Sequence, residues 1–202
     1  MAGERSIVYV VDDDAEVLTA LERLLRSNGF SVRTFPSPAT FLESPIDAEA
    51  GCLVLDLAMP DLSGLDLQSV LEGRASLLPI VFLTGHGDIE ASVHAMKHGA
   101  VDFLTKPAND ATLIAAVKAA LAKSEALRSG QAERASIEKR LATLTTRERQ
   151  VLDGVIAGRL NKQIAAELGT AEKTVKVHRG NLMRKMQVRS VAELVKLVHG
   201  LT

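Results

Sequence analysis

Carboxylates, a hydroxyl and an ammonium group stand at the ends of four short apolar runs in this chain. Asp12–Asp14 follow the first run, Asp56 closes the third, Thr84 closes the fourth and Lys106 follows the fifth. Carboxylates that lie close together cannot all ionise easily without a cation, and Mg²⁺ prefers oxygen ligands and keeps several waters. With such an ion nearby, Asp56 could act as a nucleophile toward a phosphoryl group whose oxygens contact Lys106 and Thr84.

Each of these residues also has a plainer explanation when it is taken alone. Aspartate is common in turns because its carboxylate accepts backbone hydrogen bonds, and threonine and lysine are common at surfaces. The chemical interpretation requires that the chain bring all four positions together. In a parallel α/β sheet the carboxyl ends of the strands face one crevice, so the question is whether these runs form such a sheet.

The first part of the chain alternates short apolar runs with amphipathic segments. The segment between the first two runs has leucines at helical spacing and ends at Gly29, and a second such segment ends at Gly99. In the latter, Ile89, Val93 and Met96 are expected to point inward. This alternation predicts an α/β domain with a parallel sheet covered by helices on both faces. The five predicted strands are 7–11, 31–35, 52–56, 80–84 and 101–105.

The second part, from about residue 143, has no strand-like run and reads as four helices. A Ser/Thr cap at Thr145 precedes the first of them. Between the two parts, a helical pattern continues from the last helix of the sheet domain and weakens at Ser129 and Gly130. We therefore expect an α/β domain at 1–123, a helical linker at 124–142, which could also be a short pairing surface, and an all-α domain at 143–202.

Charge divides the chain in the same way. Residues 141–202 hold 11 Lys+Arg and 5 Asp+Glu. The whole chain has 24 Lys+Arg and 25 Asp+Glu, so residues 1–140 hold 13 Lys+Arg and 20 Asp+Glu. An acidic N-terminal part and a basic C-terminal part suggest domains with different partners. The single cysteine fits a reducing compartment, and no apolar run approaches the roughly 18 residues of a membrane span. These features predict a cytoplasmic protein with no membrane partner.

Four motifs of the first part resemble the receiver domain of bacterial two-component response regulators: "VVDDD", "LDLAMPDLSG", "LTGHGD" and "DFLTKP". The resemblance implies a flavodoxin-like (βα)5 fold in which a sensor histidine kinase phosphorylates Asp56. It implies that Thr84 and Phe103 are a switch pair that reorients on phosphorylation. It also places a Mg²⁺ ion at Asp12, Asp13, Asp56 and the backbone carbonyl of Ala58, where many relatives carry a polar side chain.

A short helix, a turn at Gly169 and a second, basic helix have the spacing of a helix-turn-helix. Residues 144–186 resemble the LuxR-type DNA-binding domain of the FixJ/NarL family. This resemblance places Lys176, Val177 and Gly180 at base edges, although relatives often present a side chain at the position of Gly180. The residues expected at DNA are Lys162, Lys173, Thr174, Lys176, Val177, His178, Arg179, Gly180, Asn181 and Lys185.

The combined expectation is a transcription regulator, not an enzyme, that phosphorylation converts to a homodimer. Phosphorylation would reshape the face formed by the segment 89–99 and the fifth strand, which would then either dimerise or release the C-terminal domain. Promoter DNA and RNA polymerase would be partners. The terminal helix, with apolar residues at 191, 194, 195 and 198, either pairs two copies or packs within its own domain. An aspartate phosphatase of the haloacid dehalogenase type is disfavoured, because its nucleophile usually follows the first strand. A regulator that binds DNA regardless of phosphorylation is the other alternative.

Overall fold

The computed structural model describes residues 6–45, 51–85 and 89–200, and the chain divides into two compact units, residues 1–129 and 130–202. The units are considered separately. Residues 86–88 of the "LTGHGD" motif lie outside the described residues. No helix in the described ranges is both long enough and apolar enough to cross a membrane.

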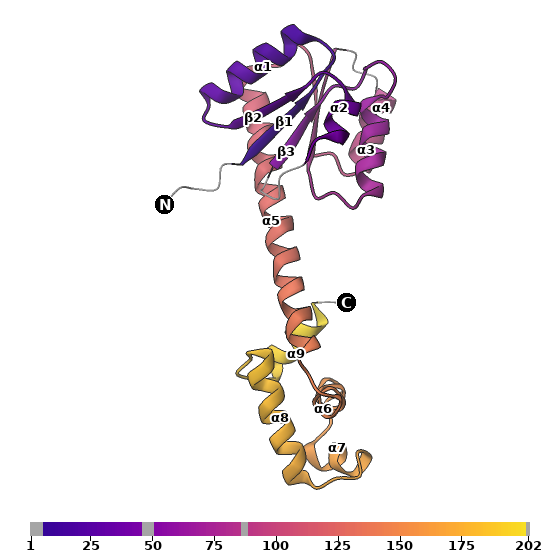
Figure 1. The fold of residues 1–202 in the computed structure, drawn as a ribbon, viewed down its shortest axis with the longest axis vertical. Coiled ribbons are helices and arrows are strands. Elements are labelled where there is room, and N and C mark those ends of the chain that lie inside the picture. The colour runs from indigo at the N-terminus through magenta and orange to yellow at the C-terminus, as the bar shows by residue number, and fades with distance from the viewer. Residues whose placement is uncertain (1–5, 46–50, 86–88, 201–202) are drawn as a thin grey trace. The chain divides into compact units, whose positions relative to one another are not determined.

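The first unit contains a five-stranded parallel sheet with strand order β2-β1-β3-β4-β5, and Figure 1 labels its first three strands. Three strands match the prediction from sequence and two are shifted: the third begins and ends one residue earlier than expected, and the fifth starts one residue later. Asp56 is therefore the first residue after its strand. The strands are β1 (Ile7–Val11), β2 (Ser31–Phe35), β3 (Gly51–Leu55), β4 (Ile80–Thr84) and β5 (Asp102–Thr105).

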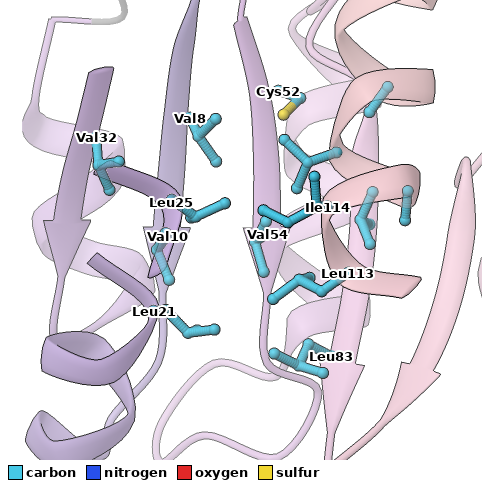
Figure 2. Packing of buried hydrophobic residues seen from close by; sticks show 14 residues of the cluster. Val8, Val10, Leu21, Leu25, Val32, Cys52, Val54, Leu83, Leu113 and Ile114 are labelled. Carbon is cyan, nitrogen blue, oxygen red and sulfur yellow. The ribbon is translucent and has the colours of Figure 1, made fainter. Parts of the chain in front are cut away.

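Helices cover both faces of this sheet because successive strand residues point to opposite faces. On one face, Val8, Val10 and Val54 pack with α1 and the beginning of α5, as Figure 2 shows for Leu21, Leu25, Leu113 and Ile114. On the other face, Tyr9, Leu53 and Leu55 pack with α2, α3 and α4. The helices are α1 (Ala15–Ser27), α2 (Pro38–Glu43), α3 (Gly64–Gly73), α4 (Ile89–Lys97) and α5 (Asp110–Ala142).

Helix α4 is rotated from the orientation expected from its sequence. Ile89, Val93 and Met96 were expected to point inward but are 79%, 46% and 47% exposed, whereas Ala95 is fully buried. The reason is a contact with α3: the buried Gln68 side chain donates from Nε2 to the backbone oxygens of Ala95 (3.1 Å) and of His98 (2.9 Å). The small residue lets the helix approach closely, and the larger apolar residues face outward.

The second unit is built on α6 (Thr146–Ile156), α7 (Asn161–Glu167), α8 (Glu172–Met186) and α9 (Val191–His199). Ile137, near the end of α5, joins their core. Residues 129 and 130 lie inside α5, which is continuous across the expected linker. Leu194 of α9 is fully buried in this core, and Val191 and Val198 pack against it. The structure thus uses these three residues for packing within their own unit.

Candidate functional site

The acidic residues of the first unit meet where the strand order reverses. β1 lies between β2 and β3, and its register with β3 sets Val11 opposite Leu55. The next residues along these strands, Asp12 and Asp56, therefore lie side by side, and the amide of Asp56 donates to the carbonyl of Val11 at 2.9 Å. Such a reversal point at the carboxyl ends of the strands is where ligands bind in open α/β sheets.

Lys106, which follows β5, joins the two carboxylates. Its Nζ donates to Asp12 Oδ2 at 2.5 Å and to Asp56 Oδ1 at 2.8 Å. Both carboxylates are almost fully buried, whereas the lysine side chain is 23% exposed. Two carboxylates share one ammonium group, so this cluster keeps a net negative charge when all three groups are ionised.

The protonation behaviour of the cluster reflects this imbalance. Burial raises the pKa of Asp12 above its ordinary value, although hydrogen bonds from Lys106 and from the amide of Asp14 oppose the rise. Burial alone would lower the pKa of Lys106, but its bonds to the two carboxylates outweigh burial and raise it. The charged lysine is therefore favoured, while the charge on Asp12 is only partly compensated.

The loop after β3 fixes the second oxygen of Asp56. Asp56 Oδ2 accepts a hydrogen bond from the amide of Ala58 at 2.8 Å. Behind it, a Cβ at Gly64 would lie 2.3 Å from the backbone oxygen of Asp56, and the Gly64 amide donates to the carbonyl of Leu57 at 2.9 Å. Only glycine allows the start of α3 to approach this closely. The sequence shows Gly64 merely as a turn residue, whereas the structure gives it this role in positioning Asp56.

Thr84 and Phe103 lie on the same face of neighbouring strands. β4 and β5 pair with Phe82 opposite Phe103, and the two rings are 5.9 Å apart between centroids. Thr84 lies two residues beyond Phe82 on β4, so its side chain is on the same face, and it is fully buried. The amide of Lys106 donates to the Thr84 carbonyl at 2.7 Å, which ties this strand end to the acidic cluster.

Asp13 differs from its neighbour because its side chain is exposed. Within the described ranges, no three His, Cys, Asp or Glu side chains are grouped closely enough to hold a metal ion by themselves. Two buried carboxylates with uncompensated charge nevertheless suit Mg²⁺, which proteins typically bind through one or two carboxylates together with waters and phosphate oxygens. The residues present are thus compatible with this ion.

In the second unit, α7 and α8 form the helix-turn-helix, and Gly169 at the turn has a φ of +61°. One side of α8 is exposed along its length, with residues at the i, i+3, i+4 and i+7 spacing that defines a helix face. We call this the α8 outer face. It consists of Lys173, Lys176, Val177, Gly180 and Arg184.

Other residues predicted at DNA are bound inside the unit. Lys185 donates from Nζ to Glu148 Oε2 at 2.6 Å and to the carbonyl of Thr143 at 2.8 Å. Arg179 donates to Asn161 Oδ1 at 2.8 Å, which links α8 to the start of α7. These side chains hold α8 in place in the structure described. Of the other residues predicted to contact DNA, Lys162 and Thr174 are exposed, and His178 and Asn181 are partly exposed.

Two protein families match the chain. Residues 8–118 match the response regulator receiver domain, and residues 142–198 match the bacterial regulatory proteins of the luxR family. The chain belongs to the response regulators with a LuxR-type DNA-binding domain. This family consists of transcription regulators and not of enzymes, which removes the phosphatase alternative.

Curated relatives and solved structures agree with this assignment over the whole length of the chain. Response regulator protein TodT of Pseudomonas putida is 45% identical over 201 residues, which cover 100% of this chain and 88% of that protein. Transcriptional regulatory protein FixJ of Azorhizobium caulinodans is 44% identical over 190 residues, which cover 94% of this chain and 90% of that protein. A structure of the response regulator StyR has 48% identity and a TM-score of 0.87, and covers 96% of this chain and 98% of that one. Full-length FixJ from B. japonicum has 42% identity and a TM-score of 0.60, with 98% and 97% covered.

Sequence reasoning missed two residues that hold α8 in place in this response regulator. Glu148 is buried, binds Lys185 and also accepts from the amide of Thr145 at 2.8 Å. The Thr145 cap was predicted, and a glutamate three residues later is the signal of a capping box, but nothing local connects Glu148 with Lys185. Asn161, at the start of α7, carries no sequence signal for its bond to Arg179.

Proposed function

We propose that Asp56 is the phosphorylation site through which a sensor histidine kinase controls this response regulator. The observation that carries the proposal is the sharing of Lys106 between Asp12 and Asp56 at the reversal point of the sheet. An oxygen of Asp56 would attack the phosphorus of a phosphohistidine. The P–O bond would form as the P–N bond breaks, and the electron pair would return to the imidazole.

The surrounding residues supply the charge that this transfer requires. Lys106 already binds Asp56 and can move onto a phosphoryl oxygen when that carboxylate becomes an acyl phosphate. Its bond to Asp12 would keep the Lys106 ammonium group nearby. Asp12, Asp13, Asp56 and the carbonyl of Ala58 are the proposed ligands of Mg²⁺. When bound, this ion would neutralise phosphoryl oxygens and part of the carboxylate charge.

Phosphorylation would reach the surface through Thr84 and Phe103. The buried Thr84 hydroxyl would turn toward the phosphoryl group, and the Phe103 ring would follow into the space beside it. The neighbouring surface carries the exposed Ile89, Val93 and Met96 of α4. A contiguous exposed apolar patch often marks an interaction site, and we infer that a second copy of the receiver domain covers this one.

Dimerisation would bring two α8 helices to DNA half-sites about one helical turn apart. Lys176, Val177 and Gly180 of the α8 outer face would meet base edges of promoter DNA. Phosphates would be contacted by residues with exposed or partly exposed side chains, namely Lys162, Lys173, Thr174, His178 and Asn181. Arg179 and Lys185 would hold α8 in position for these contacts. RNA polymerase would be a further partner, and the protein would act in the cytoplasm.

Light scattering of the full chain tests this proposal. In Mg²⁺, beryllium fluoride should convert the wild type from monomer to dimer by mimicking the phosphoryl group, and Asp56→Asn should stay monomeric. Asp61→Asn is the matched control, because Asp61 is exposed in the same loop and its φ of 66° suits asparagine. Dimerisation of Asp56→Asn by the mimic, or none in the wild type, would contradict the proposal. Equal promoter binding by Asp56→Asn and wild type would favour a regulator that ignores phosphate.

A further inference from the structure

Two histidines lie one helical turn apart at the C-terminal end of α4. The rings of His94 and His98 are stacked, with centroids 4.3 Å apart and an angle of 23° between their planes. The amide of His98 donates to the carbonyl of His94 at 3.1 Å, so the helical spacing continues past Lys97, the last residue of α4. Both histidine side chains are exposed. Residues four apart on a helix share one face, so both rings can reach the same ligand.

Helix α3, which lies beside α4 (Figure 1), holds the second histidine at two points. Gln68, whose side chain is buried, donates from Nε2 to the backbone oxygen of His98 at 2.9 Å. One turn further along α3, Glu72 Oε2 lies 3.3 Å from His98 Nδ1. An ionised carboxylate can only accept a hydrogen bond, so this contact favours the proton on Nδ1. In the neutral ring, Nε2 of His98 then keeps its lone pair for a ligand.

A carboxylate bonded to one nitrogen of a histidine, with the other nitrogen unprotonated, is the usual arrangement around metal-binding histidines. We propose that Nε2 of His98 and a ring nitrogen of His94 bind one divalent transition-metal ion of the class of Zn²⁺, Ni²⁺ and Cu²⁺, which imidazole ligands suit. Water would fill the other coordination positions. Glu72 is a positioning residue that orients His98 and does not bind the ion. The site therefore needs two protein ligands and not a group of three, which the described ranges do not contain.

The spacing of the two rings is close to what a shared ion requires. With metal–nitrogen bonds of about 2.1 Å, two nitrogen ligands of one ion lie about 3.0–3.4 Å apart. The ring centroids of His94 and His98 are 4.3 Å apart, so the rings would have to tilt until their lone pairs converge on one point. Because both side chains are exposed, this movement displaces no residue of the core.

This site is separate from the acidic cluster of the same unit. Helix α4 runs from the end of β4 back to the start of β5, so His98 lies near the amino ends of the strands, whereas Asp12 and Asp56 follow carboxyl ends. The ligands differ as well, because carboxylates and water suit Mg²⁺ and imidazole suits the transition metals. The proposal thus does not depend on phosphorylation of Asp56. The ion would tie the end of α4 to α3 through His98 and Glu72.

Calorimetric titration of the full-length chain with Ni²⁺ tests the site, in excess Mg²⁺ so that carboxylate sites do not contribute. His94→Gln and His98→Gln each remove one nitrogen ligand, and Glu72→Gln keeps the size of the side chain but removes its charge. His199→Gln is the matched control, because His199 is an exposed histidine at the end of a helix, α9. Electron paramagnetic resonance of bound Cu²⁺ then counts the nitrogen ligands.

We expect the wild type to bind one Ni²⁺ ion. Either substitution at His94 or His98 should weaken binding about ten-fold or more, because the second imidazole no longer acts at a high effective concentration. Glu72→Gln should weaken binding about ten-fold without changing the unfolding temperature, and His199→Gln should not weaken it. Bound Cu²⁺ should have two nitrogen ligands in the wild type and in Glu72→Gln, but one in either variant at His94 or His98.

Three results would contradict these expectations. If the wild type binds no Ni²⁺ in excess Mg²⁺, or if His94→Gln and His98→Gln bind it as tightly as the wild type, the proposed site is wrong. An equal loss of affinity in His199→Gln and His94→Gln would also overturn the proposal, because the ion would then lie elsewhere. Unchanged affinity in Glu72→Gln would reject the positioning role of Glu72.

Discussion

A buried carboxylate bonded to a lysine occurs in each unit of this response regulator, and the two arrangements are used differently. In the first unit, Lys106 lies between Asp12 and Asp56. In the second, Lys185 binds Glu148 and the carbonyl of Thr143. Both lysines come from segments far along the chain from their acids. The chemistry of the side chains is nearly the same, so the difference lies in what surrounds them.

Charge balance separates the two clusters. Lys106 serves two buried carboxylates, and burial raises the pKa of Asp12. Glu148 has a lysine to itself and caps a helix as well, and these hydrogen bonds, that of Lys185 foremost, lower its pKa. An acid whose charge is left partly uncompensated can bind a cation or accept a phosphoryl group. An acid whose charge is compensated by its own lysine and by a backbone amide instead stabilises the fold. The pKa values of Asp12 and Glu148 are accordingly shifted in opposite directions.

The largest effect is expected from breaking the balanced cluster. Glu148→Ala removes the acceptor for the Thr145 amide and the partner of Lys185, so the second unit should lose about 2–3 kcal/mol of stability. Hydrogen exchange of the α6 and α8 amides measures this loss. Glu148→Gln is the control, because glutamine still caps the helix and should cost about half as much. Losses below about 0.5 kcal/mol for both variants would show that the cluster is not structural.

Removing a charge from the unbalanced cluster should have the opposite sign. Asp12→Asn leaves Lys106 and Asp56 as a neutral pair, so the first unit should gain about 1 kcal/mol when a chelator is present. Mg²⁺ should stabilise the wild type more than this variant. Urea unfolding followed by the fluorescence of the buried Tyr9, the chain's single tyrosine, measures both effects.

Asp14→Asn is the matched control for that substitution. Asp14 is exposed and caps α1, a position where asparagine serves equally well, so stability should not change. Destabilisation by Asp12→Asn would mean that its hydrogen bond to Lys106 outweighs the burial of its charge.

The smallest effect is the dependence of each cluster on pH, and it should differ in sign. Asp12 has a folded-state pKa above its ordinary 3.8, so its ionisation opposes folding, and acidification toward that raised pKa relieves the penalty. Glu148 has a folded-state pKa below its ordinary 4.5, so its contribution is present above that value and is lost as pH falls through the folded pKa. Hydrogen exchange in both units between about pH 7 and about pH 2.5 tests this, because the contribution of Glu148 is lost only below its ordinary 4.5. Equal responses of Asp12→Asn and wild type in the first unit, or of Glu148→Gln and wild type in the second, would contradict it.

Local pattern was enough to predict most strands but not how tightly they pair. β1 and β4 are compact apolar runs, β2 is apolar only at Val32 and Phe35, and all three match their predicted bounds. β3 begins one residue earlier, at Gly51, where a Cβ would lie 2.8 Å from the backbone oxygen of Ile7. Glycine is a weak strand former by propensity, yet here it allows close pairing with β1. Strand propensity cannot predict this close approach, because the approach depends on the position of the neighbouring strand.

The same limit applies to helix faces and to the candidate sites. Apolar periodicity in α4 favoured Ile89, Val93 and Met96 as the inner face, but Gln68 of α3 sets the rotation of the helix. Strand ends could be read from the sequence, so the meeting of Asp12, Asp56 and Lys106 was predictable once a parallel sheet was assumed. The pairing of Glu148 with Lys185 was not predictable. It depends on how the four helices pack together, whereas the sequence pattern indicates each helix separately.

The rate of thiol labelling at Cys52 can report how often the first unit opens. Cys52 is the only cysteine, it lies fully buried in β3 four residues before Asp56, and burial raises its pKa to about 12 (Figure 2). A thiol reagent can therefore modify it only when the sheet opens. The rate at which the protein gains one label then reports the opening of the first unit alone. Ion or phosphoryl-mimic binding at Asp56 would be recorded as slower labelling, while the second unit contributes no signal.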